Sequence, residues 1–275
     1  MPLNVPGILV PFQLLIYPRL ALPHLAVKDI RHLDFQALKK AGYRGAVFDK
    51  DNCLTIPYKD QLVPELNEAW KECLETFGED NVLIVSNSAG TYLDAGGIQS
   101  ESVSHHLGVS VLLHKSFKPA YSCISSVRAY FSGLKSPLRE DELIVVGDRI
   151  FTDVVMANRM RMARDKEAKS PNLIQMSMQC AFEKEGTVAT EKETVGINDM
   201  SITNRPLAVW TTGVWKRESM AMRYLEKRLV DAVQKWSKPP GDEPLDTKRF
   251  VKSWSEPLPP QKTWLEKVIW VFKWT

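Results

Sequence analysis

Short apolar runs that alternate with helix-like segments constrain this 275-residue chain more than any other feature. Runs rich in Val, Leu and Ile occupy residues 46–48, 82–85, 109–113, 143–146 and 207–212. Hydrophobic periodicity predicts helices over residues 35–40, 63–76, 120–131 and 218–236. Strands that alternate with helices form βαβ units, in which the strands are parallel and helices cover both faces of the sheet. The sequence therefore predicts an α/β fold, a three-layer sandwich around a doubly wound parallel sheet.

Polar residues stand directly after three of these strands. They are Asp49 and Asp51 after the first, Ser86, Asn87 and Ser88 after the second, and Asp148 and Asp153 after the run 143–146. In open α/β sheets, ligands bind beyond the carboxyl ends of the strands. We therefore expect these side chains to converge on one site.

Asp49 and Asp51 are suited to phosphoryl transfer. Alternate residues of an extended segment point the same way, so both carboxylates can reach a phosphate at the strand tip. A carboxylate can attack phosphorus, and a second carboxyl can protonate the leaving alkoxide. We assign Asp49 as nucleophile and Asp51 as acid/base partner. A magnesium ion bridging carboxylate and phosphate would offset the repulsion between the two anions.

The other polar residues fit supporting roles. Hydroxyl and backbone N–H groups of Ser86, Asn87 and Ser88 can hold phosphate oxygens. A lysine would neutralise both the phosphate and the attacking carboxylate, and we favour Lys118, which precedes Pro119, over the alternative Lys115. Asp148 stands where a metal ligand is needed. We expect Asp153 to support it or to orient the lysine.

This constellation resembles the haloacid dehalogenase (HAD) superfamily of phosphatases. The matches are Phe48-Asp49-Lys50-Asp51-Asn52, Ser86, Lys118, and Gly147-Asp148 through Asp153. The resemblance implies an HAD-like Rossmannoid fold, with magnesium bound by Asp49, the main-chain carbonyl of Asp51, and Asp148. Cys53 stands where the first motif usually has Thr, Val or Ser. A small side chain still fits there, and we expect no catalytic role for Cys53.

Residues 22–162 are similar to the mitochondrial phosphatidylglycerophosphate phosphatases of this superfamily. The similarity lies in residues 33–40, in 45–52, and in the strings Gly147-Asp148-Arg149-Ile150-Phe151-Thr152-Asp153-Val154 and Asn158-Arg159-Met160. It implies removal of the terminal phosphate of phosphatidylglycerophosphate, an anionic phospholipid, to give phosphatidylglycerol, a cardiolipin precursor. It also implies a location in the mitochondrial matrix, peripheral on the inner membrane.

The spacing of the motifs predicts a capless site. About 35 residues separate Asp49 from Ser86 and about 30 separate Ser86 from Lys118, and one helix and one strand use up each interval. An open site admits a headgroup that is still attached to a bilayer.

Three parts are expected along the chain: an apolar N-terminal segment (1–30), a phosphatase domain (31–236) with a polar insertion at about 165–199, and a Pro-rich linker with a Trp-rich segment (237–275). The apolar run 8–22 is too short and too interrupted by proline for a spanning helix, and it is no secretory signal. The Trp-rich segment and the run 8–22 are candidate membrane contacts, and packing of the Trp-rich segment on the domain or on another chain is the alternative.

Composition excludes some classes of protein. A net charge of +3 is too small and too dispersed to predict nucleic-acid binding. Four cysteines without a CxxC pair predict neither a disulfide framework nor a zinc site. No pattern specifies an oligomeric state. Two rival functions remain open: an HAD phosphatase for a soluble phosphoester or phosphoprotein, and a catalytically silent membrane-associated assembly protein.

Overall fold

The computed structural model describes residues 4–169, 205–218, 220–237 and 247–252. They form a six-stranded, all-parallel sheet in the order β1-β6-β5-β2-β3-β4. The strands are β1 Leu25–Val27, β2 Gly45–Phe48, β3 Val82–Ile84, β4 Ser110–Val111, β5 Leu143–Gly147 and β6 Leu207–Thr211. The helices are α1 Val5–Ile8, α2 Val10–Ile16, α3 Phe35–Lys40, α4 Asn67–Phe77, α5 Ile98–Leu107, α6 Tyr121–Ser132, α7 Val155–Lys169 and α9 Met220–Trp236.

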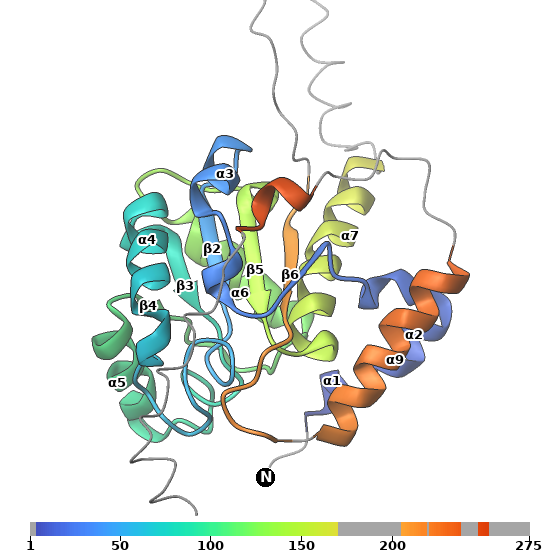
Figure 1. Ribbon diagram of the computed structural model, residues 1–275, viewed down its shortest axis with the longest axis horizontal. Coiled ribbons are helices and arrows are strands. Elements are labelled where there is room, and N and C mark those ends of the chain that lie inside the picture. Colours follow the sequence, from blue (N-terminus) through green and yellow to red (C-terminus); the bar gives the residue numbers. More distant parts are fainter. Residues whose placement is uncertain (1–3, 170–204, 219, 238–246, 253–275) are drawn as a thin grey trace, which may run out of the picture.

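Helices cover both faces of the sheet (Figure 1). Alternate strand residues face opposite sides, so Ala46 and Phe48 pack with α3, α4 and α5, whereas Val47 packs with α2, α6 and α7. The central strands are buried along their whole length, as the continuous Val, Leu and Ile runs require when both faces are covered. The predicted three-layer α/β sandwich with a doubly wound parallel sheet is confirmed.

The predicted elements appear close to their expected positions. The helix at 35–40 is found with the same bounds, and the expected helix 63–76 begins as a 3-10 turn, Pro64–Leu66, before α4. The spacing of the motifs predicted one helix between Ser86 and Lys118 without giving its bounds, and α5 lies there, whereas β1 was not predicted. No cap domain interrupts the described chain between β2 and β4, where α4 and α5 are the only α-helices.

The N-terminal segment packs on the domain. Val10, Leu14, Leu20 and Ala21 are buried in the core on the α6–α7 side of the sheet, and β1 pairs with β6 at the sheet edge. Among the described helices, none combines the length and the apolar composition needed to cross a membrane. Residues 253–275, which hold the Trp-rich segment, and most of the predicted polar insertion and Pro-rich linker lie outside the described residues.

Candidate active site

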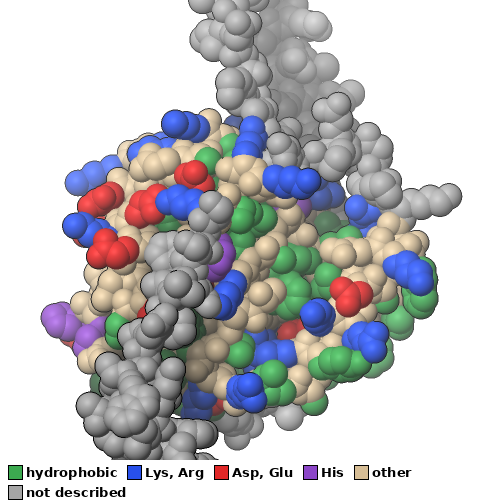
Figure 2. All heavy atoms as spheres, in the orientation of Figure 1, with side chains coloured by type: hydrophobic (Ala, Val, Ile, Leu, Met, Phe, Trp, Pro, Cys, Tyr) green, Lys and Arg blue, Asp and Glu red, His purple; other side chains and the backbone are tan. Residues whose placement is uncertain are grey.

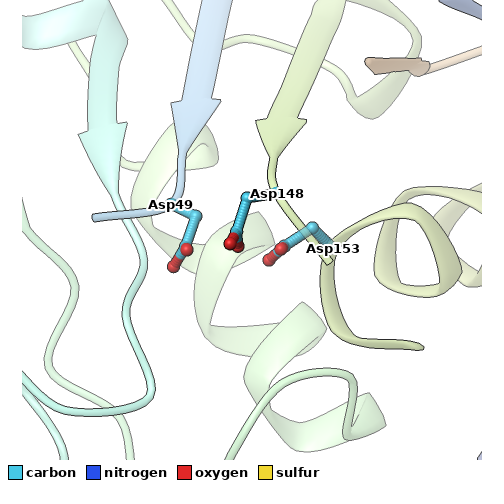
Figure 3. A group of neighbouring side chains, drawn as sticks. All are labelled: Asp49, Asp148 and Asp153. Carbon is cyan, nitrogen blue, oxygen red and sulfur yellow. The ribbon is translucent and has the colours of Figure 1, made fainter. Parts of the chain in front are cut away.

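Three aspartates meet beyond the carboxyl ends of the two central strands. Asp49 follows β2, Asp148 follows β5, and Asp153 lies in the π-helical turn Ile150–Val154 that leads into α7. One carboxylate oxygen from each lies within 4.8 Å of the others, and the side chains point toward one another (Figure 3). Gly147 allows this approach, because a Cβ there would overlap the Asp153 side chain.

Lys118 lies between two of these acids. Its Nζ donates to Oδ1 of Asp49 at 2.5 Å and to Oδ1 of Asp153 at 2.7 Å. Burial alone would lower the pKa of Lys118, but the charges of Asp153 and Asp49 outweigh it and the pKa lies above its ordinary value. Lys118 therefore stays an ammonium group. Lys115, the alternative from the sequence, is exposed.

Burial raises the pKa of Asp49 above its ordinary value, and the neighbouring Asp153 adds to the rise while Lys118 opposes it. The pKa of Asp148 is raised further, first by burial and then by Asp49 and Asp153. The carboxylates thus repel one another where burial limits their solvation. A cation placed among them would relieve this repulsion.

Asp148 also contacts two arginines. A guanidinium nitrogen of Arg223, from α9, donates to Oδ2 of Asp148, and another lies 3.4 Å from its main-chain oxygen. The side chain of Arg149 lies 3.6 Å from the same Oδ2. The helix α9 is held there by Glu226 as well, whose carboxylate accepts from the backbone N–H of Phe151 at 3.4 Å.

Asp51 stands apart from the three-acid group and is more exposed, with 33% of its side chain accessible. Its Oδ1 accepts from Lys50 Nζ at 2.8 Å and from the backbone N–H of Tyr58 at 3.2 Å. Its Oδ2 accepts from the Ser88 hydroxyl at 3.1 Å. The Lys50 side chain is fully buried and also donates to the main-chain oxygen of Lys59. Asp51 is therefore fixed in place on the open side of the site.

Ser86 and its neighbours connect Asp51 to Lys118. The hydroxyls of Ser86 and Ser88 are hydrogen-bonded at 2.9 Å, and the backbone N–H of Ser88 donates to Ser86 Oγ. Oδ1 of Asn87 accepts from the backbone N–H of Lys118 at 2.7 Å. On the far side of this loop, Asn4 donates to the main-chain oxygen of Lys118 at 3.0 Å. The residues predicted from β3 and β4 thus lie in one connected network.

The donor set fits a hard divalent cation. Three carboxylates meet here, and three cations lie against them, namely Lys118, Arg223 and Arg149. Carboxylate oxygens are the ligands that Mg²⁺ prefers in proteins. Both oxygens of Asp153 have partners within the protein, Lys118 on one and the Arg149 N–H and Thr152 hydroxyl on the other. Asp49 and Asp148 are accordingly the better-placed ligands of the three.

The structure brings together Asp49, Lys118, Asp148 and Asp153, and it connects Ser86, Asn87, Ser88 and Asp51 through hydrogen bonds. The contacts of Lys50 and Arg223 were not predicted from the sequence. Lys50 stands between Asp49 and Asp51 directly after a strand, and this position could have indicated its contact with an acid of the site. No local pattern marks Arg223, which lies 75 residues beyond Asp148.

Cys53 is buried, and burial raises the pKa of its thiol well above the ordinary value, with Asp49 and Asp148 adding to the rise. A thiol held in its neutral form is a poor nucleophile.

The chain resembles known proteins over its first 163 residues or so. The model of the mitochondrial PGP phosphatase family matches residues 5–163. A chloroplastic phosphatidylglycerophosphate phosphatase 1 from Chlamydomonas reinhardtii is 46% identical over 144 residues, covering 52% of this chain and 51% of the relative. The chloroplastic/mitochondrial phosphatidylglycerophosphate phosphatase 1 from Arabidopsis thaliana is 39% identical over 159 residues, covering 57% and 44%.

The mitochondrial phosphatidylglycerophosphatase GEP4 from Saccharomyces cerevisiae is 34% identical over 158 residues, covering 58% of this chain and 83% of that protein. The chain spans about half the length of the Chlamydomonas and Arabidopsis relatives. No solved structure matches it. The family match includes every predicted site residue from Asp49 to Asp153. The chain belongs to the mitochondrial PGP phosphatase family.

Proposed function

We propose that this protein is a magnesium-dependent phosphatase that removes the terminal phosphate of phosphatidylglycerophosphate and yields phosphatidylglycerol. The observation that carries the proposal is the ion pair between Asp49 and Lys118 at the end of the central strand β2, in a chain of this family. It holds a carboxylate and a cation where a phosphate at the strand tip would meet both.

The first step transfers the phosphoryl group to the protein. An oxygen of Asp49 attacks phosphorus, the bond from phosphorus to the glycerol oxygen breaks, and Asp51 donates a proton to that oxygen. Lys118 and the hydroxyl and N–H groups around Ser86 hold the phosphoryl oxygens. The product of this step is an aspartyl-phosphate on Asp49 and a free phosphatidylglycerol.

The second step releases phosphate. Asp51, now a carboxylate, takes a proton from a water molecule, and the water oxygen attacks phosphorus from the open side of the site. The bond between phosphorus and Asp49 breaks, and inorganic phosphate leaves. The greater exposure of Asp51 supports this role, because the group that activates water must be reached by it.

Asp49, the main-chain carbonyl of Asp51, and Asp148 would hold the magnesium ion. When bound, the ion supplies positive charge that draws the phosphate toward Asp49 and stabilises charge as it develops. Asp153 orients Lys118 through the 2.7 Å hydrogen bond between them.

The relatives support the lipid substrate, because the three named above are phosphatidylglycerophosphate phosphatases by name. The capless arrangement supports it as well, since the described chain places no domain over the site. We propose a location in the mitochondrial matrix, peripheral on the inner membrane; the family description supports the mitochondrion.

Phosphate release from phosphatidylglycerophosphate, glycerol 3-phosphate and an aryl phosphate, with magnesium and with EDTA, tests the proposal. Magnesium-dependent release that is fastest from the lipid is expected. Release from the soluble esters at an equal or higher rate would instead favour a phosphatase for soluble substrates. No release from any of the three would favour the silent assembly protein, and the intact acids and lysine count against that outcome.

A further inference from the structure

Exposed apolar side chains are concentrated at the active-site end of the molecule. Among the described residues, all large hydrophobic side chains that are exposed, except Trp236 and Val251, lie in two regions. One region is the α1–α2 segment, with Val5, Ile8, Leu9, Phe12, Leu15, Ile16 and Tyr17. The other comprises the loops after β2, β3, β4 and β6 and the starts of the helices that follow them, with Ile56, Tyr58, Tyr92, Leu93, Ile98, Leu113, Tyr121, Met220, Met222, Tyr224 and Leu225.

The α1–α2 segment has an apolar face that nothing in the described chain covers. Val10 and Leu14 are buried against the domain, whereas Phe12, Leu15 and Ile16 are 65%, 83% and 72% exposed. A soluble surface rarely exposes neighbouring side chains of this size without a binding role. The turn Pro18–Ala21 that follows α2 contacts α9. On the face drawn in Figure 2, hydrophobic side chains lie beside Lys and Arg over α9.

This apolar segment is attached to the active site itself. Asn4, which caps α1, donates to the main-chain oxygen of Lys118. Gln13, from α2, accepts from the Arg159 guanidinium, which also donates to the main-chain oxygen of Pro119 at 2.5 Å. At the other side of the site, Arg223 joins α9 to Asp148. A surface that contacted α1, α2 and the start of α9 would therefore lie at the mouth of the site.

The charges at this end select an anionic partner. Four exposed basic side chains lie in the connections that follow β2, β4 and β6, namely Lys59, Lys115, Lys216 and Arg217, against one exposed acid, Glu65. Residues 1–28 contain no Asp or Glu. Apolar and aromatic side chains together with Lys and Arg match the interface of a bilayer, where the apolar groups enter the acyl boundary and the cations meet anionic headgroups.

We infer that the carboxyl end of the sheet, with the α1–α2 face as its anchor, is a docking surface for an anionic phospholipid bilayer. Docked in this way, the open site faces the membrane, and Asp49 meets a phosphate in the headgroup layer. The orientation rests on the proposed function, because it takes the substrate to be a lipid. Binding to the bilayer depends only on the exposed apolar and basic side chains and not on the identity of the substrate.

Vesicle binding by the full-length protein tests this inference without turnover. Flotation with phosphatidylcholine vesicles, with and without about a third of phosphatidylglycerol, compares the wild type with Phe12→Glu/Leu15→Glu. Trp236→Glu/Val251→Glu is the matched control, because it also adds two acids at exposed apolar residues, away from the active-site end. We expect the wild type to bind the anionic vesicles, the first variant to lose binding about tenfold or more, and the control to stay within about twofold.

Hydrolysis of a soluble aryl phosphate checks each variant and should match the wild type, since neither pair contacts the substrate. Equal vesicle binding by Phe12→Glu/Leu15→Glu and the wild type would overturn the inference, as would an equal loss in the control. A lower melting temperature with unchanged vesicle binding would mean that the chain itself covers the α1–α2 face. Loss of a dimer in sedimentation, without any vesicle binding, would identify the face as a self-association surface. A protein that binds vesicles but hydrolyses nothing would overturn the proposed function and leave the docking intact.

Discussion

Lys118 Nζ lies 2.7 Å from Oδ1 of Asp153 and 2.5 Å from Oδ1 of Asp49, so one ammonium group donates hydrogen bonds to two buried carboxylates. The lysine follows β4 and the acids follow β5 and β2, so the arrangement exists only when these strands are assembled. The ion pairs thus couple the stability of the fold to the chemistry of the site, and substitutions can separate the two effects.

Replacing Lys118 with Met should lower both stability and activity. It leaves Asp49 and Asp153 buried without their cation, and breaking a buried pair in this way costs about 3 kcal/mol of unfolding free energy. We expect phosphatase activity to fall by about a hundredfold or more. The double variant Lys118→Met/Asp153→Asn should recover stability but not activity, as measured by urea unfolding and phosphate release. The exposed Lys115→Met is the control, and an equal loss there would contradict the assignment.

Replacing Asp51 with Asn should allow the first half of the reaction and block the second. An aryl phosphate has a leaving group that needs no proton, so about one equivalent of phenol should appear in a burst before turnover nearly stops. An alkyl phosphate should give no burst. Rapid-mixing absorbance measurements follow the phenol, with the nearby Asp60→Asn as the control. Steady turnover of the alkyl ester by Asp51→Asn would exclude Asp51 as the acid/base group.

The guanidinium of Arg223 forms an ion pair with Oδ2 of Asp148, a proposed magnesium ligand. That charge competes with the metal, so Arg223→Gln should lower the magnesium concentration for half-maximal hydrolysis of an aryl phosphate by about fivefold, corresponding to about 1 kcal/mol. Arg228→Gln, on the same helix but against Tyr224, should leave it unchanged. A higher magnesium requirement in Arg223→Gln would show that the guanidinium positions Asp148 for the metal.

His24 should make the fold sensitive to acid. Burial, with the nearby charges of Arg205 and Arg161, lowers its pKa from 6.5 to about 4, and its Nδ1 accepts a hydrogen bond from the backbone N–H of Ala208. The unfolded chain therefore binds the proton first as pH falls, and stability present above pH 6.5 is lost progressively toward pH 4.

From about pH 7 to about pH 5.5 this group should remove roughly 1 kcal/mol of unfolding free energy. Urea unfolding across this range should show a steeper loss in the wild type than in His24→Gln, whose amide oxygen can still accept the hydrogen bond. Parallel curves for the two proteins would contradict the assignment.

Local patterns in the sequence predicted most of the fold. The runs at 46–48, 82–85 and 143–146 form central strands because both faces are buried, which requires continuous apolar sequence. By contrast, β1 has only three residues and gains its partner from β6, far along the chain. The bounds of α5 could not be predicted, because this helix carries polar residues around most of its surface and its apolar stripe is weak.

The candidate site was predictable for the same reason, because Asp49, Ser86 and Asp148 each follow a strand that the sequence marks. Arg223 and Asn4 could not be predicted. Their contacts depend on how α9 and the N-terminal turn pack against the strand ends, and nothing within a few residues of either one records that packing. The sequence favoured Lys118 over Lys115 because Pro119 follows it, and the structure places Lys118 between two acids while Lys115 is exposed.

Phosphate release from phosphatidylglycerophosphate in mixed vesicles by the wild type and Asp49→Asn, with magnesium, is the most direct test of Asp49 as the nucleophile. We predict magnesium-dependent release by the wild type and a loss of about a thousandfold or more in Asp49→Asn. The melting temperature of Asp49→Asn should not fall, because the substitution removes one of three mutually repelling carboxylates. Turnover by a folded Asp49→Asn protein at a rate near the wild type would contradict an aspartyl-phosphate at this residue.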